Sequence, residues 1–228
     1  MRREDLAAMS VEQLLEQTQT NVTSDPAEGL AIAQYAFERA KSPITLGTAA
    51  RQAAIRAEQA GESQDVVDTW FGKSRDALSS NEPGIRRELI ATELLTGRAL
   101  SLRIERLGSV AVNLASQASE AFERGEAILQ EQHIRGKAWD RFGTMLARHR
   151  ATYEAMNGDA GFALATSIKG IWRAVRAKSE GTPERNLPFI LKQVGMNAIA
   201  STLAISKPLS RSSKIADARH QVALKLLS

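Results

Sequence analysis

Apolar residues recur every three or four positions along most of the chain, in long segments separated by short breaks rich in Gly, Pro, Asn and Ser. That spacing places the apolar residues on one side of an α-helix, and the breaks mark helix ends. No segment shows the alternating or β-branched pattern that is typical of strands. The pattern therefore predicts an all-α protein.

The breaks divide the chain into ten expected helices. The first begins after Ser10, which forms a capping-box pattern with Gln13, and the second begins at Pro26 with Asp25 as its N-cap. The other eight are expected at about residues 44–60, 63–79, 85–107, 110–129, 133–156, 160–178, 184–205 and 212–227. Connections this short place consecutive helices side by side in antiparallel pairs.

Three segments carry small, turn and aromatic residues at related positions. The members are Ala31, Tyr35 and Pro43; Ala54, Gly61, Glu62, Val66 and Trp70; and Ala151, Gly158, Asp159 and Ala163. In these residues the chain resembles the tetratricopeptide-repeat (TPR) family over about residues 10–180, although its helix pairs recur every 40 to 55 residues instead of about 34. The resemblance implies a TPR-like α-solenoid of stacked antiparallel hairpins, with a concave face that binds a protein or peptide and no catalysis.

The domain organisation follows from these helices. We expect a TPR-like helical repeat region over residues 1–180 and a C-terminal helical hairpin over 181–228 that packs on it, with one continuous domain as the alternative. Small residues such as Ala54, Ala151 and Ala163 are expected where paired helices approach closely.

Composition narrows the protein class. An apolar content of 43% with a net charge of only +4 argues against disorder, and 36 alanines favour helix. Because the chain has no Cys, a disulfide scaffold, a Cys-ligated zinc site and a thiol nucleophile are excluded. No signal peptide and no transmembrane helix are expected, so we expect a cytoplasmic protein of bacterial type without a membrane partner.

The sequence lacks the common catalytic and metal-binding patterns. The three histidines lie far apart and outside metal-ligand spacing, and Gly72-Lys73-Ser74 lacks the earlier glycine and the preceding strand of a phosphate-binding loop. No nucleophile motif occurs. We therefore expect no enzymatic activity, no metal and no cofactor.

The charge distribution is the main functional clue. Residues 1–130 carry 14 Lys and Arg against 19 Asp and Glu, whereas residues 131–228 carry 16 against 7. Two basic stripes on the helices expected at 133–156 and 160–178 make up the candidate partner-binding patch. Its members are Lys137, Arg141, Arg148, Lys169, Arg173 and Arg176. Such a patch could bind an acidic peptide, a C-terminal carboxylate or a nucleic-acid backbone, or it is simply the solvated face of two amphipathic helices.

Three apolar stripes complete the pattern. Phe142, Met145, Leu146, Tyr153 and Met156 form one, and Phe162, Ile168, Trp172 and Val175 form the next. Both are expected to lie in the core. The 14 residues 193–206 carry no charge, and we expect them to be core or, if exposed, an interface.

The leading hypothesis is a non-enzymatic helical scaffold that binds a protein or peptide ligand, either acidic or neutral, with regulation as one candidate role. One alternative is a nucleic-acid-associated helical protein that uses its basic C-terminal half. Another is a structural subunit that self-associates into a homo-oligomer through its oppositely charged halves and the helix expected at 184–205.

Overall fold

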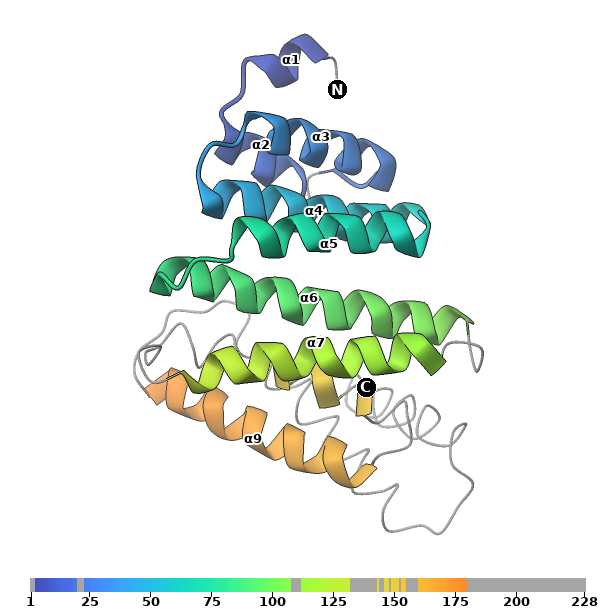
Figure 1. Ribbon diagram of the computed structural model, residues 1–228, viewed down its shortest axis with the longest axis vertical. Coiled ribbons are helices and arrows are strands. Elements are labelled where there is room, and N and C mark those ends of the chain that lie inside the picture. The colour runs from blue at the N-terminus through green and yellow to red at the C-terminus, as the bar shows by residue number, and fades with distance from the viewer. Residues whose placement is uncertain are drawn as a thin grey trace, which may run out of the picture. The chain divides into compact units, whose positions relative to one another are not determined.

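The computed structural model describes residues 3–19, 23–107, 112–131, 143, 146–147, 149–151, 153–154 and 160–179. All of the regular secondary structure in these residues is α-helix, which confirms the predicted all-α class (Figure 1). The chain forms two compact units, the N-terminal unit Met1–Ala99 and the C-terminal unit Leu100–Ser228. Each is described by itself.

Eight helices have described bounds. They are α1 (Arg3–Ala7), α2 (Val11–Gln17), α3 (Pro26–Arg39), α4 (Pro43–Ala60), α5 (Gln64–Ala77), α6 (Pro83–Leu107), α7 (Val112–Gln130) and α9 (Ala160–Ser179). From α3 onward these helices begin and end within two residues of the predicted positions. Helix α1 was not predicted, because five residues are too few to show a periodic pattern.

Three expected helices fall wholly or largely outside the described residues. Those at 184–205 and 212–227 lie entirely outside them, and so does most of 133–156, although its described residues are helical. The expected boundary at 180/181 also lies at the edge of the described residues and stays a prediction. The division between the two compact units falls within α6 instead.

The helix ends use the capping residues that the sequence predicts. The Ser10 side chain accepts a hydrogen bond from the Gln13 backbone N–H, and the Gln13 side chain accepts one from Ser10 in return. Asp25 caps α3 through the backbone N–H of Ala27. Helix α4 ends at Gly61, whose φ of 81° is in the left-handed region that glycine adopts without strain.

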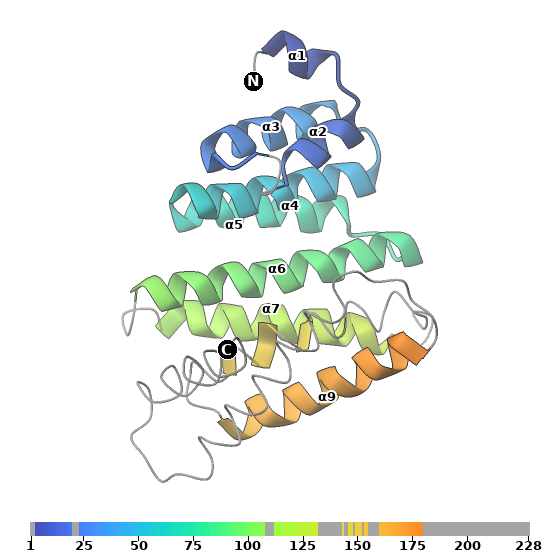
Figure 2. The ribbon, with the colours of Figure 1, turned by 180° about the vertical axis from the view of Figure 1, so that it is seen from behind.

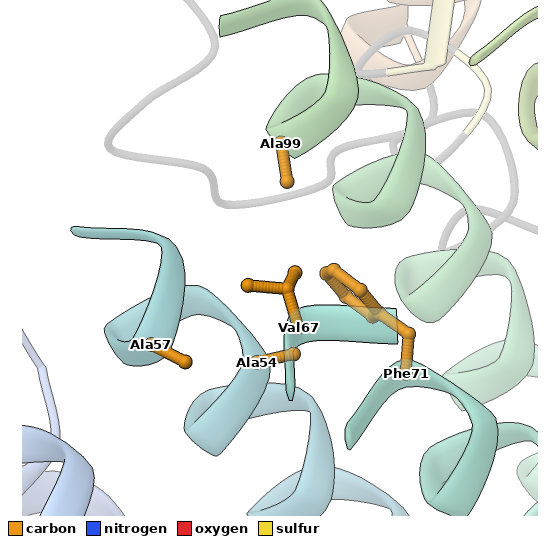
Figure 3. Close-up of a cluster of buried hydrophobic side chains, with 5 residues drawn as sticks. All are labelled: Ala54, Ala57, Val67, Phe71 and Ala99. Carbon is orange, nitrogen blue, oxygen red and sulfur yellow. The ribbon is translucent and has the colours of Figure 1, made fainter. Parts of the chain in front are cut away.

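In the N-terminal unit, α3, α4 and α5 lie side by side, with α2 against α3 and α4 (Figure 2). Helix α4 is the central one, and alanines on several of its sides are fully buried. Figure 3 shows how Val67 and Phe71 of α5 pack against Ala54 and Ala57 of α4, with Ala99 of α6 beside them. The small side chains of α4 let its neighbours approach closely, as expected for Ala54.

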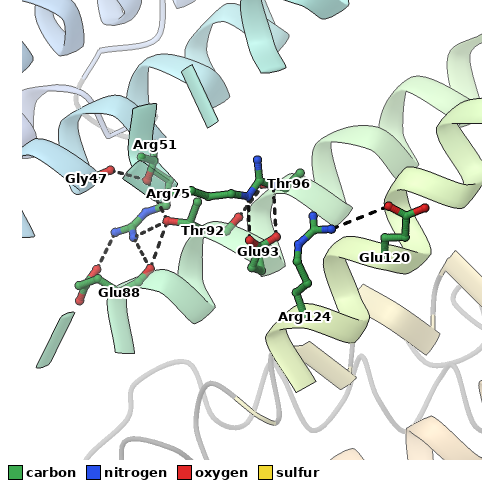
Figure 4. A network of polar contacts seen from close by, with 10 residues as sticks. Gly47, Arg51, Arg75, Glu88, Thr92, Glu93, Thr96, Glu120 and Arg124 are labelled. Atoms are coloured by element: carbon green, nitrogen blue, oxygen red, sulfur yellow. Dashed lines mark hydrogen bonds and ion pairs between the residues drawn. The ribbon is translucent and has the colours of Figure 1, made fainter. Parts of the chain in front are cut away.

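A buried polar network joins α4 and α5 to α6 (Figure 4). Arg51 donates to the Glu88 carboxylate at 2.8 Å and to the Glu88 backbone carbonyl at 2.9 Å. Arg75 forms a two-pronged ion pair with the buried Glu93, at 2.7 and 3.2 Å. Between these pairs, the Thr92 hydroxyl lies 2.9 Å from that of Ser74. Because these polar groups satisfy one another, the network leaves none of these charges unpaired and fixes how α6 packs against α4 and α5.

In the C-terminal unit, residues of 143–154 contact α7. The rings of Phe122 and Tyr153 lie 5.8 Å apart, and the Tyr153 hydroxyl donates to the Ala115 backbone carbonyl at 2.6 Å. Ala151 and Ala163 are fully buried, which confirms that these alanines lie where helices pack. Leu146 and Tyr153 are also buried, as the first apolar stripe predicts, while the other members of that stripe lie outside the described residues.

Candidate partner-binding surface

The predicted basic patch can be located through two of its six members. The side chains of Lys169 and Arg173 are described, on α9. The side chain of Arg176, although its backbone belongs to α9, lies outside the described part of the structure. Lys137, Arg141 and Arg148 lie outside it altogether. The patch as a whole therefore stays a prediction.

Lys169 and Arg173 converge on one carboxylate, that of Glu126 on α7. Arg173 donates to Glu126 Oε1 at 2.9 Å and to Oε2 at 3.3 Å, and it also donates to the Gly143 backbone carbonyl at 3.3 Å. Lys169 donates to the same Oε1. The Arg173 side chain is only 15% exposed, whereas that of Lys169 is 48% exposed. Arg173 thus holds α9 to α7, and Lys169 is the cation that also reaches solvent.

The electrostatics of Glu126 follow from these contacts. Burial by itself would raise the pKa of the Glu126 carboxyl, but hydrogen bonds and charge from Arg173 and Lys169 outweigh burial, and the pKa is lowered. A carboxyl whose pKa is lower in the folded state stabilises that state above its unfolded pKa.

We expect the stabilisation of the folded state by the ionised Glu126 carboxylate to be lost in acid. It is fully present above the ordinary pKa of 4.5 and disappears as the pH falls through the lower pKa of the folded state. Glu126→Gln should lower the free energy of unfolding at pH 7 by about 1–2 kcal/mol and flatten its decline below pH 4.5. Urea denaturation of both proteins from neutral to acidic pH measures this. If the free energy of unfolding depends on pH in the same way in both proteins, the protonation of Glu126 does not contribute to that dependence.

The two sides of α9 differ in side-chain size. Its buried side consists of Ala163, Ser167 and Gly170. These positions follow one another at i+4 and i+3, so they lie on one face of the helix. Small residues there allow neighbouring segments of the protein to approach α9 closely, and none of the large apolar side chains described on α9 is fully buried.

Three large apolar side chains lie on the opposite side of α9 and are exposed, whereas Leu164 and Ile171 are half-buried. Phe162 is 70% exposed, Ile168 57% and Trp172 61%. Ala165 and Lys169 are exposed on the same side of the helix. We call these five residues, Phe162, Ala165, Ile168, Lys169 and Trp172, the outer face of α9.

The outer face corrects one expectation. The stripe of Phe162, Ile168 and Trp172 was predicted to be core, and that prediction was wrong for these three residues, because the small residues occupy the buried side. The side chain of the fourth member, Val175, lies outside the described residues. The sequence signal that could have shown this is the spacing of Ala163, Ser167 and Gly170, which forms a second, small-residue stripe opposite the first.

An apolar surface of this kind is characteristic of binding. Scattered apolar residues are normal on a protein surface, but large ones gathered on one helix face mark an interaction site. Lys169 adds a cation at the edge of this apolar surface.

Other site classes find no support in the described part of the chain. No group of His, Asp and Glu there could hold a metal ion. None of the described helices is long and apolar enough to cross a membrane. Comparisons with protein-family models, with curated proteins and with solved structures found no match to this chain.

Proposed function

We propose that the chain is a non-enzymatic helical scaffold of TPR-like stacked hairpins that binds a protein or peptide partner. The observation that carries the proposal is the outer face of α9, where Phe162, Ile168 and Trp172 expose large apolar surface beside Lys169. Large apolar and aromatic side chains supply most of the binding energy at protein interfaces.

The polar groups of the described core support a binding function over a catalytic one. Arg51 and Arg75 are engaged by carboxylates in the network with α6, and Arg173 is engaged by Glu126. These pairs hold helices together. An acid or base for catalysis is instead expected in a cleft, poised for a substrate.

A displayed library of random peptides, selected on the full chain, tests the proposal. We expect enriched peptides that bind the wild-type chain and lose binding to Ile168→Asp, because an ionised carboxylate at the centre of the outer face must be desolvated by any apolar ligand. Ala127→Asp is the matched control, since Ala127 is an exposed helical position on α7. A selection that yields no ligand, together with turnover in a panel of enzymatic assays, would contradict the proposal.

A further inference from the structure

We propose that the outer face of α9 binds an amphipathic helix with an apolar side and acidic flanks. This inference rests on the proposed function and specifies its partner class. Two properties of α9 carry it: the shape of the exposed apolar surface and the charge of the helix around it.

The shape of the surface favours a helical ligand. The exposed apolar residues run from Phe162 to Trp172, about three turns or 15 Å of helix. An amphipathic helix is recognised through apolar contacts along one helix face, and the described structure, which contains only helices, offers no sheet edge to which an extended peptide could add as a strand. A partner helix satisfies its own backbone hydrogen bonds and packs its side chains between the ridges of α9.

The charge of α9 favours acidic flanks. Residues 160–179 contain Lys169, Arg173, Arg176 and Lys178 and not one Asp or Glu. Glu126 offsets part of this charge, but its single carboxylate is shared between Lys169 and Arg173. Carboxylates that flank an apolar stripe would therefore find complementary charge along the edge of the outer face that carries Lys169, with Arg173 next to it, and this charge steers association and fixes orientation.

The same charge disfavours the simplest self-association. Packing the outer faces of two copies against each other would bring two helices of the same positive sign together, and like charges at an interface are repulsive. A partner from outside the chain, carrying the opposite charge, meets no such penalty.

Two synthetic helical peptides serve as probes. Both carry leucines at the spacing of one helix face; the first has glutamates at the flanking positions, and the second has lysines instead. Each is fluorescently labelled and titrated with the full chain, below the concentration at which it self-associates. We expect the glutamate peptide to bind at least about tenfold more tightly than the lysine peptide, with an affinity that falls as salt rises.

Position 165 offers a matched pair of variants. Ala165 is an exposed helical residue on the outer face, so Ala165→Glu and Ala165→Lys each add a long side chain without disturbing the core. We expect Ala165→Glu to weaken binding of the glutamate peptide about tenfold and Ala165→Lys to leave it equal or tighter. Equal effects of the two variants, or equal binding of the two peptides, overturn the inference.

The absence of Cys allows the occupant of the face to be identified directly. Ile168→Cys should react with a maleimide in the dilute full chain about as fast as Ala127→Cys, and the glutamate peptide should slow only the former. Slow reaction of Ile168→Cys at every concentration means that the chain covers its own face. Slow reaction only in concentrated protein means that a second copy does. Either result overturns the inference.

The titrations with the two peptides and the selection from the library can fail independently, so the acidic-helix inference and the proposed scaffold function are tested separately. If the peptide library yields ligands that require Ile168 but carry no acidic residues, the scaffold function stands and the acidic helix is wrong. If neither the library nor the glutamate peptide binds, both proposals fail.

Discussion

Replacing Arg56 with alanine should lower the free energy of unfolding of the N-terminal unit by about 3–5 kcal/mol. Arg56 is only 1% exposed, and its guanidinium donates to the backbone carbonyls of Thr18 at 2.8 Å and of Thr23 at 2.6 Å. Both of these residues are buried, so the substitution leaves two carbonyl acceptors without their donors and a cavity where the side chain was.

The charge of Arg56 does not reverse this expectation. Burial lowers the pKa of the Arg56 guanidinium, and the negative charge of Asp25 acts in the opposite direction. Arginine remains protonated in folded proteins nonetheless. The packing around the group is also specific: a Cβ atom on Gly29 would lie 2.6 Å from Arg56 Nε. The guanidinium therefore occupies space that the sequence keeps open for it.

Urea denaturation followed by circular dichroism measures the effect, with hydrogen exchange in α4 as the local readout. Arg87→Ala is the matched control, because Arg87 is an exposed helical arginine of the same unit, and we expect it to change stability by less than about 0.5 kcal/mol. Equal stability of the two variants would mean that the hydrogen bonds of Arg56 make no net contribution to the free energy of unfolding.

Gly47→Val should destabilise the same unit by about 2–3 kcal/mol. Gly47 lies in α4, where a Cβ atom would lie 2.4 Å from Cγ of the fully buried Leu78. The clash involves the branch point of a packed leucine and not the far end of a flexible side chain. Either Leu78 leaves its rotamer or α4 and α5 move apart. Each of these two changes loses packing contacts between the helices.

Gly72→Val is the matched substitution for this prediction. Gly72 is also a helical glycine, on α5, but a Cβ atom there would meet no other atom within 4 Å. Valine is a better helix former than glycine, so we expect Gly72→Val to be neutral or slightly stabilising. Thermal and urea denaturation of the two variants make the comparison. Destabilisation of both by the same amount would place the cost in the helix backbone and not in the contact with Leu78.

Much of the fold could be predicted because local residue chemistry decides it. The capping residues Ser10 and Asp25 and the left-handed Gly61 each act within one turn of a helix end, so the sequence nearby contains the whole signal. Helix α1 was missed because its five residues are too few to show a periodic pattern and its end depends on a distant residue. Its end is held by Arg39, whose guanidinium donates to the carbonyls of Leu6, Ala7 and Met9 from 30 to 33 residues away.

The buried polar network could not be predicted, because its pairs join different helices. Arg51 and Glu88 lie 37 positions apart in sequence, and Arg75 and Glu93 lie 18 apart. Neither spacing makes two side chains neighbours on one helix, where residues three or four positions apart meet. In the sequence these residues look like ordinary solvated charges, and only the packing of α4, α5 and α6 brings them together.

The candidate site could also be predicted only in part, because contacts between helices do not follow from spacing within one helix. The basic stripe of Lys169 and Arg173 was predicted from spacing within α9, and the two residues do lie together there. Their common partner Glu126 lies on another helix and could not be foreseen. The buried side of α9 was predicted wrongly, because a small-residue stripe and a large apolar stripe both fit a helix face. Close packing selects the small one.

Binding of a selected peptide to the wild-type chain and to Ile168→Asp tests the central claim most directly. If the outer face of α9 is the binding surface, the dissociation constant of such a peptide should rise at least about tenfold in Ile168→Asp, and the Ala127→Asp control should match the wild type. An unchanged affinity in a folded Ile168→Asp protein would contradict the claim, because an apolar ligand cannot cover a carboxylate at the centre of its site without cost.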